Sequence, residues 1–166
     1  TITAGTGSDT VVISGDGNVI DNANQLGGVE TLELAGTTVS IDGVVLGTLD
    51  NAVGGLDEIK GNASSSEVTI TAAAGASTVD LTKLTLTSLK SIEVDAANAG
   101  GTVQLNLTAA QIAQVGSFKS SADTTLKVKT TVAGLSAISG KAAGATLIVD
   151  DSIAALLASS SSLTGV

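Results

Sequence analysis

Apolar and polar residues alternate in short runs along most of the chain, and β-branched residues are frequent in these runs. A period of two is typical of a β-strand with one buried and one solvated face. Glycine, serine and asparagine separate the runs, as expected for turns. The pattern predicts strands at 10–13, 31–34, 38–41, 68–71, 84–87, 91–94, 102–107, 126–128 and 146–149.

Three segments carry helical signals instead. Residues 108–116 begin with a capping box, in which the hydroxyl of Thr108 accepts from a free amide and Gln111 reaches back. Apolar residues follow, and a glycine closes the run. A second helix is predicted at 153–157, capped by the aspartates before it. A weaker helical turn is predicted at 21–26.

A degenerate internal repeat is also visible. Each copy places an apolar residue two positions before a short strand-like run and tends to end in glycine. The copies lie at 28–36, 55–61, 88–94 and 134–140. Their spacing is uneven, at roughly 27 to 46 residues, a range in which repeats are typical of solenoids. The uneven spacing indicates loops or helical turns inserted between the coils.

We therefore expect one all-β domain over residues 1–166. Its predicted fold is a parallel β-helix (β-solenoid), right-handed, with one to three short helical insertions. A β-sandwich is the alternative, because it produces the same alternation. However, no Asn-Gly or Asp-Gly pair lies closely between two clear strands, and Asp42-Gly43 is the nearest candidate for a hairpin turn. The chain also lacks proline, a residue that often prevents exposed sheet edges from pairing with other strands. A solenoid needs less protection of this kind, because each coil covers the next.

The composition narrows the chemistry. The chain has no His, Cys, Arg, Tyr, Trp, Met or Pro, and Phe118 is its only aromatic residue. Sixteen carboxylates and seven lysines give a net charge of −9, which argues against nucleic acid because phosphate contacts need clustered cations. The acidic surface argues equally against anionic membranes, and no apolar run is long enough for membrane insertion. It is compatible with divalent cations.

Catalysis has little support in the residue types. Asp57-Glu58 and Asp150-Asp151 are adjacent carboxylate pairs, and adjacent residues on a strand point to opposite faces. Neither pair forms a natural acid/base dyad, and helix capping is the better interpretation of Asp150-Asp151. A glycosidase needs two carboxylates across a sugar cleft, and the chain offers no aromatic platform for a sugar ring. We expect no catalytic residues and no enzyme.

One segment suggests a metal site. Residues 4–12 read Ala-Gly-Thr-Gly-Ser-Asp-Thr-Val-Val, close to the calcium nonapeptide G-G-x-G-x-D-x-U-x. Glycines let backbone carbonyls turn toward a cation, and an aspartate supplies a hard anionic oxygen. Calcium takes six to eight oxygens, so a second turn must face the first. The predicted metal residues are Gly5, Gly7, Asp9 and Asp16. As an alternative, Asp9 is a turn residue that opens a strand.

The same stretch, with Gly27-Gly28-Val29-Glu30-Thr31-Leu32-Glu33-Leu34 after it, resembles the repeats of hemolysin-type (RTX) secreted bacterial proteins. It also resembles related S-layer proteins and large adhesins. The specific similarity covers residues 4–36, and the rest is similar in composition and cadence. The resemblance implies type I secretion, a calcium-stabilised β-roll or β-helix, and a role at the cell surface. The chain departs from this pattern by having one near-complete nonapeptide and no tandem array.

The expected function is therefore structural. We interpret the chain as a segment of a secreted bacterial surface-layer, adhesin or extracellular-filament protein, located outside the cell or on its surface. Its expected partners are other copies of itself or neighbouring domains of the same polypeptide. The chain has no initiator Met and no visible signal peptide, so we expect a piece of a longer secreted protein. The alternatives are a β-helix polysaccharide lyase or hydrolase, and a calcium-dependent folding module with calcium as its cofactor.

Overall fold

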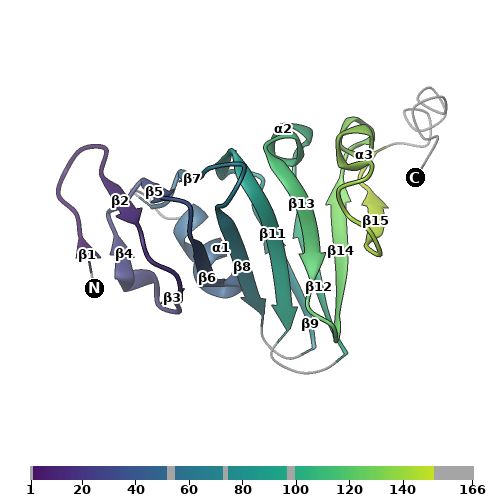
Figure 1. The fold of residues 1–166 in the computed structure, drawn as a ribbon, viewed down its shortest axis with the longest axis horizontal. Coiled ribbons are helices and arrows are strands. Elements are labelled where there is room, and N and C mark those ends of the chain that lie inside the picture. The colour runs from purple at the N-terminus through teal and green to yellow at the C-terminus, as the bar shows by residue number, and fades with distance from the viewer. Residues whose placement is uncertain (1, 52–54, 73–74, 97–99, 152–166) are drawn as a thin grey trace.

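The computed structural model describes residues 2–51, 55–72, 75–96 and 100–151, which are mostly β-strand (Figure 1). Every strand pair within these residues is parallel and in register. The strands build three stacked parallel sheets in a β-solenoid-like arrangement. The antiparallel pairing that defines a β-sandwich does not occur among these strands.

Each sheet collects one strand from successive coils of the chain. The first sheet contains β2 (Thr10–Ile13), β5 (Thr31–Leu34), β7 (Glu58–Lys60) and β10 (Thr85–Thr87). The second contains β3 (Asn18–Ile20), β6 (Thr38–Asp42), β8 (Glu67–Ala72), β11 (Leu89–Ala96) and β13 (Val115–Ser120). The third contains β9 (Ala76–Asp80), β12 (Gly101–Asn106), β14 (Thr124–Thr130) and β15 (Thr146–Val149). The short strands β1 (Ile2–Thr3) and β4 (Leu26–Gly27) pair separately.

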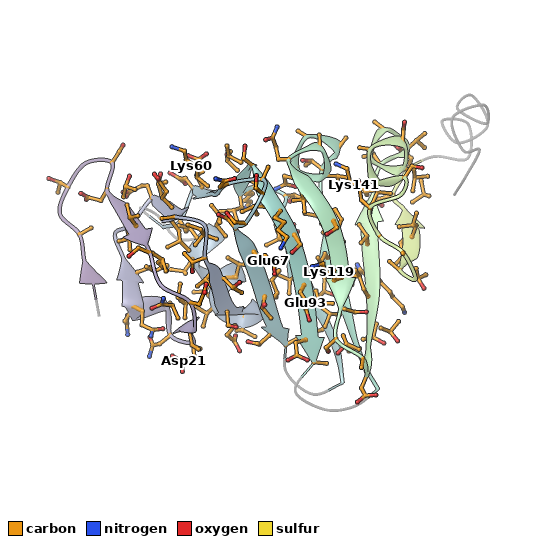
Figure 2. All side chains as sticks on the ribbon, in the orientation of Figure 1. Asp21, Lys60, Glu67, Glu93, Lys119 and Lys141 are labelled. Carbon is orange, nitrogen blue, oxygen red and sulfur yellow. The ribbon has the colours of Figure 1, made fainter. Side chains whose placement is uncertain are left out.

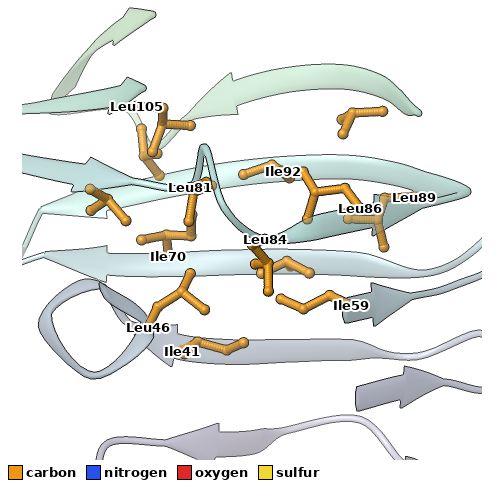
Figure 3. Close-up of a cluster of buried hydrophobic side chains, with 14 of the residues drawn as sticks. Ile41, Leu46, Ile59, Ile70, Leu81, Leu84, Leu86, Leu89, Ile92 and Leu105 are labelled. Atoms are coloured by element: carbon orange, nitrogen blue, oxygen red, sulfur yellow. The ribbon is translucent and has the colours of Figure 1, made fainter. Parts of the chain in front are cut away.

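The core is made of apolar columns that run through the stack. In the second sheet, paired positions place Val39, Val68, Ile92 and Phe118 above one another, each at most 2% exposed. Matching columns in the other two sheets point to the same interior, and Figure 3 shows part of this cluster. Burying one such side chain contributes about 1.5–3 kcal/mol, so the columns hold successive coils together.

Helices replace strands at different places on the three faces. The helix α1 (Gly43–Asn51) follows β6 and packs against β9, where the third sheet would otherwise continue. At the other end of the stack, α2 (Ala109–Ala113) and α3 (Val132–Ile138) precede second-sheet positions and pack against each other. They therefore stand where the first sheet would continue. As a result, the first and second sheets begin near the N-terminus, and the third sheet is shifted toward the C-terminus.

All nine predicted strands coincide with strands of the structure. The predicted turn at 21–26 contains a 3-10 helix, η1 (Ala23–Gln25), with its own capping box. The helix at 153–157 lies outside the described residues. Two helices of the structure, α1 and α3, were not predicted from the sequence. The strands β1, β3, β4, β9 and β13 were not predicted either, and β7 was indicated only as the strand-like run of the second repeat copy.

The helix predicted at 108–116 is α2, with the expected capping box between Thr108 and Gln111. The predicted C-terminal part is wrong, because Val115 already belongs to β13. Gly116 does not end the helix. A Cβ atom at this position would lie 2.7 Å from the carbonyl oxygen of Lys90, so this glycine allows two coils to approach closely.

The structure confirms part of the predicted repeat and contradicts the candidate hairpin turn at Asp42-Gly43. The first two repeat copies do stack, since Leu32 pairs with Ile59. The third copy lies in the second sheet, and the fourth largely forms α3. A strand with alternating buried residues and a short helix can show the same spacing of apolar residues, so the sequence did not distinguish them. Asp42 makes no hairpin: its Oδ1 accepts hydrogen bonds from Val44 N at 2.9 Å and Val45 N at 3.1 Å. It caps the start of α1.

Candidate functional site

The N-terminal end of the stack carries two uncovered strands, β2 and β3. Among the described residues, each pairs on one side only, with β5 and β6 respectively. We call this feature the β2–β3 edge. An outer strand of a parallel sheet leaves backbone N–H and C=O groups unpaired on its free side, which is a template for another strand.

Apolar side chains accompany these free backbone groups. Val12 is 57% exposed and Val19 is 56% exposed, although both lie on strands. A groove of about 480 Å³ crosses this end and is lined mainly by β2, β3 and the side chain of Leu26. Exposed apolar strands at a sheet edge are unusual in a protein that stays monomeric, because they favour pairing with another chain.

The opposite edges of the first and second sheets are covered. Gln111 of α2 donates from Nε2 to the carbonyl oxygen of Leu84 at 2.5 Å, and Gln114 accepts from Ser88 N at 3.3 Å. These two amide side chains supply hydrogen bonds beside β10 that a further strand would otherwise make. For the second sheet, Phe118 N donates to the carbonyl oxygen of Lys141 at 2.7 Å.

Charge is distributed unevenly along the stack. Nine of the sixteen carboxylates and none of the seven lysines lie in residues 1–59, which therefore carry a net charge of −9. Residues 60–166 contain seven carboxylates and seven lysines and are neutral. The acidic part includes the β2–β3 edge, and four lysines lie in residues 115–149. Figure 2 places Asp21 far from Lys119 and Lys141.

The structure places the predicted calcium residues around β2. Gly5 and Gly7 lie in the loop between β1 and β2, and Gly7 has a φ of +139°, which favours glycine. Asp9 precedes β2, and its backbone N donates to Glu30 Oε2 at 2.7 Å. Asp16 follows β2, and its Oδ1 accepts from Thr38 N at 2.9 Å.

The two aspartates therefore stand at opposite ends of β2 and do not face each other across one turn. One oxygen of Asp9, Oδ2, is buried without a hydrogen-bond partner in the described part of the chain. Within that part, no group of three or more His, Cys, Asp or Glu side chains could hold a metal ion. A calcium ion at Gly5, Gly7, Asp9 and Asp16 stays a prediction, and most of its oxygens would have to come from backbone carbonyls.

A second groove, of about 340 Å³, lies at the corner where the strands of the third sheet end. Asp80 accepts from the hydroxyl of Thr82 at 2.7 Å and from its backbone N at 3.0 Å, and these bonds lower the pKa of Asp80. Lys129 pairs with Asp150 at 3.0 Å. The charged groups of this groove thus already have partners, Asp80 within its own turn and Lys129 on the next coil.

The carboxylates of this corner groove are far apart. Asp80 and Asp150 lie three coils apart, which at about 4.8 Å per coil separates them by roughly 14 Å. Glycosidases hold their two carboxyl groups about 5 to 9.5 Å apart. Asp151, the partner in the adjacent acidic pair, accepts from Val132 N at 2.8 Å at the start of α3. Each carboxylate of this pair therefore makes a structural contact.

A charged cluster marks the outer face of the second sheet. Glu67 pairs with Lys90 at 2.6 Å and with Lys119 at 3.8 Å, and the two lysines come from the next two coils. Figure 2 labels Glu67 and Lys119 on this face. The hydrogen bond from Lys90 is the main cause of a lowered pKa at Glu67, followed by burial, which opposes it. The cluster ties three coils together on the solvent side.

The β2–β3 edge was not predicted from the sequence. A signal existed, since Val11 and Val12 are adjacent, so one of them must face outward if the other faces the core. The absence of lysine from residues 1–59 was a second signal that this end of the chain differs from the rest.

None of the described helices is long and apolar enough to cross a membrane. No family model, curated protein or solved structure matches the chain.

Proposed function

We propose that this chain is a structural segment of a secreted bacterial surface-layer, adhesin or extracellular-filament protein, and that it acts by self-association. The observation that carries the proposal is the β2–β3 edge, with its unpaired strands and its two exposed valines. A sheet edge of this kind gains hydrogen bonds and apolar burial when another strand is added. We also infer a right-handed parallel β-helix, the usual hand of parallel crossovers.

The composition supports a structural role over a catalytic one. Without His, Cys, Arg or Tyr, the chain lacks most side chains that act as acids, bases or nucleophiles near neutral pH. The resemblance of residues 4–36 to RTX and S-layer repeats supports secretion and a place at the cell surface. The stacked coils provide a rigid rod whose open end is suited to assembly.

A charge placed on the open edge tests the proposal. We expect the wild-type protein to form fibres or lattices in electron micrographs and to increase in mass with concentration by light scattering. A Val12→Lys and Val19→Lys double variant should stay monomeric, because lysines on an edge strand oppose strand addition. The matched control is a Thr78→Lys and Thr125→Lys double variant, which adds the same charge on the exposed face of the third sheet.

The control variant should assemble like the wild type, and circular dichroism should show that all three proteins are folded. A wild-type protein that is strictly monomeric at every concentration would overturn self-association. If the Val12→Lys and Val19→Lys double variant assembles as the wild type does, the contact does not involve the β2–β3 edge.

One observation favours a second candidate function, a calcium-dependent folding module. Asp9 Oδ2 is buried and unpartnered in the described part of the chain, an unfavourable state that a bound cation would relieve. Calcium should then raise the melting temperature of the wild type, and an Asp9→Asn variant should lose this response. An Asp21→Asn variant, in which an exposed carboxylate is removed, is the control. Identical melting of the wild type in calcium and in EDTA would exclude the role.

A further inference from the structure

The two ends of the stack differ in both charge and shape. The β2–β3 edge lies in a segment with nine carboxylates and no lysine. The other end is formed by α3, residues 139–145 and β15, and we call it the α3–β15 end. It follows a region that holds four of the seven lysines. Together with the carboxylates of Asp123, Asp150 and Asp151, these lysines give residues 115–151 a net charge of +1.

We propose that copies of this chain associate head to tail, with the β2–β3 edge of one copy against the α3–β15 end of the next. The inference rests on the proposed self-association and adds its polarity and the identity of the partner surface. Opposite charges attract across such a contact, whereas two β2–β3 edges would bring two acidic ends together at a cost. A heterologous contact of this kind does not close, so it builds a filament.

The shapes of the two ends fit this polarity. The α3–β15 end has its own groove of about 290 Å³, lined by small and apolar residues that include Ile138, Ala142 and Leu147. Residues 139–145 already continue the line of the second sheet, since Lys141 O accepts from Phe118 N. In a head-to-tail stack, β3 of the next copy would follow in that same line. The groove of the β2–β3 edge would then face this groove.

Residues near the lysine-rich end keep some of their charge balanced internally. Lys129 pairs with Asp150, and Lys141 donates from Nζ to the carbonyl oxygen of Ile112 at 2.9 Å. The attraction between ends is therefore a sum over several partly screened charges and is sensitive to salt. The Debye length falls from about 10 Å at 0.1 M to about 3 Å at 1 M salt, so the association should weaken several-fold over this range.

Cysteine cross-linking tests the polarity directly, because the natural chain contains no cysteine. Ser14 is exposed at the β2–β3 edge groove, and Ala143 is exposed at the groove of the α3–β15 end. Mixed Ser14→Cys and Ala143→Cys proteins should form a disulfide-linked heterodimer under mild oxidation. A chain that carries both substitutions should form a ladder of covalent oligomers. Either single variant alone should give little dimer.

The Thr78→Cys variant, on the exposed side of the third sheet, is the control for random collision and should stay uncross-linked. Dominant homodimers of the Ser14→Cys protein would show head-to-head contact and overturn the polarity. Equal cross-linking of the control would overturn it as well. Light scattering of the uncross-linked proteins separates the two proposals. Oligomers without the mixed disulfide contradict only the polarity, whereas monomers at all concentrations contradict self-association itself.

Discussion

The buried carboxamide of Gln111 donates a hydrogen bond at 2.5 Å to the carbonyl oxygen of Leu84, 27 residues earlier in the chain. The same Nε2 group also donates to the carbonyl oxygen of Leu81, and Oε1 accepts from Thr108 N at 2.7 Å. One side chain thus caps its own helix and satisfies the turn of the coil below. This contact fixes α2 over the turn that leads into β10, the last strand of the first sheet.

Replacing Gln111 with leucine should destabilise the fold by about 2–4 kcal/mol, because it removes the side-chain donor to the buried carbonyl oxygen of Leu84 and half of a capping box. The carbonyl oxygen of Leu81 still accepts from Leu84 N. The change would appear as a lower urea midpoint with an unchanged slope. Gln104→Leu is the control, since Gln104 lies on the outer face of β12 and its Nε2 donates to the side chain of Asn106 at 2.9 Å. Equal losses in the two variants would contradict the special role of Gln111.

Gly116→Ala should destabilise the protein by about 1–3 kcal/mol, because the added Cβ would lie 2.7 Å from the carbonyl oxygen of Lys90. Gly47→Ala makes the same chemical change inside α1, where a Cβ atom would meet nothing within 4 Å. That variant should be stabilised by about 0.5–1 kcal/mol through helix propensity. Thermal unfolding of both proteins checks the pair, and opposite signs are the expected result.

Lys141→Met should cost about 1 kcal/mol, because the ammonium group of Lys141 donates to the carbonyl oxygens of Ile112 and Ala113 at the C-terminal end of α2. Methionine keeps the aliphatic length and removes the charge. Lys127→Met is the matched control on the outer face of β14 and should change the free energy of unfolding by less than about 0.5 kcal/mol. Urea denaturation at low and high salt would also show whether the loss is electrostatic.

The sequence could predict the strands because their alternation is strong. β8, with buried residues at every second position, reads the same way in the sequence and in the structure. The missed helix α1 contains two adjacent valines and two glycines, which favour other conformations, and it forms because Asp42 caps it and the core below buries Leu46 and Leu49. Tertiary burial therefore outweighs local propensity at that position.

The candidate site was less accessible from sequence. The nonapeptide-like run predicts a site at Asp9, and Asp9 lies at the N-terminal end of the stack, just before β2. Val12 and Val19 occupy outward positions, since they pair with Glu33 and Ser40 on the next strands. That β2 and β3 have no further neighbour is a property of the sheet order, not of the residues themselves. Sequence periodicity assigns faces to strands but does not say which strand has no neighbour.

The pH dependence of stability should depend on Glu67. Its pKa is lowered in the folded protein, mainly by the hydrogen bond from Lys90, relative to an ordinary value of 4.5. A lowered pKa means that the ion pair stabilises the fold above pH 4.5 and that this contribution is lost as the pH falls through the folded-state pKa. Because the Lys90 side chain is 47% exposed, the contribution is modest, at less than about 1 kcal/mol.

A double-mutant cycle with Glu67→Gln and Lys90→Met isolates this term. At pH 7, the coupling energy between the two side chains should be favourable, and Lys119 should retain part of the interaction with Glu67 in the Lys90 variant. At a pH well below 4.5, protonation of Glu67 in the folded wild type should remove the coupling. Urea midpoints of the four proteins at both pH values measure it. A coupling that stays constant across this range would mean that packing of the long side chains, and not the ion pair, joins these coils.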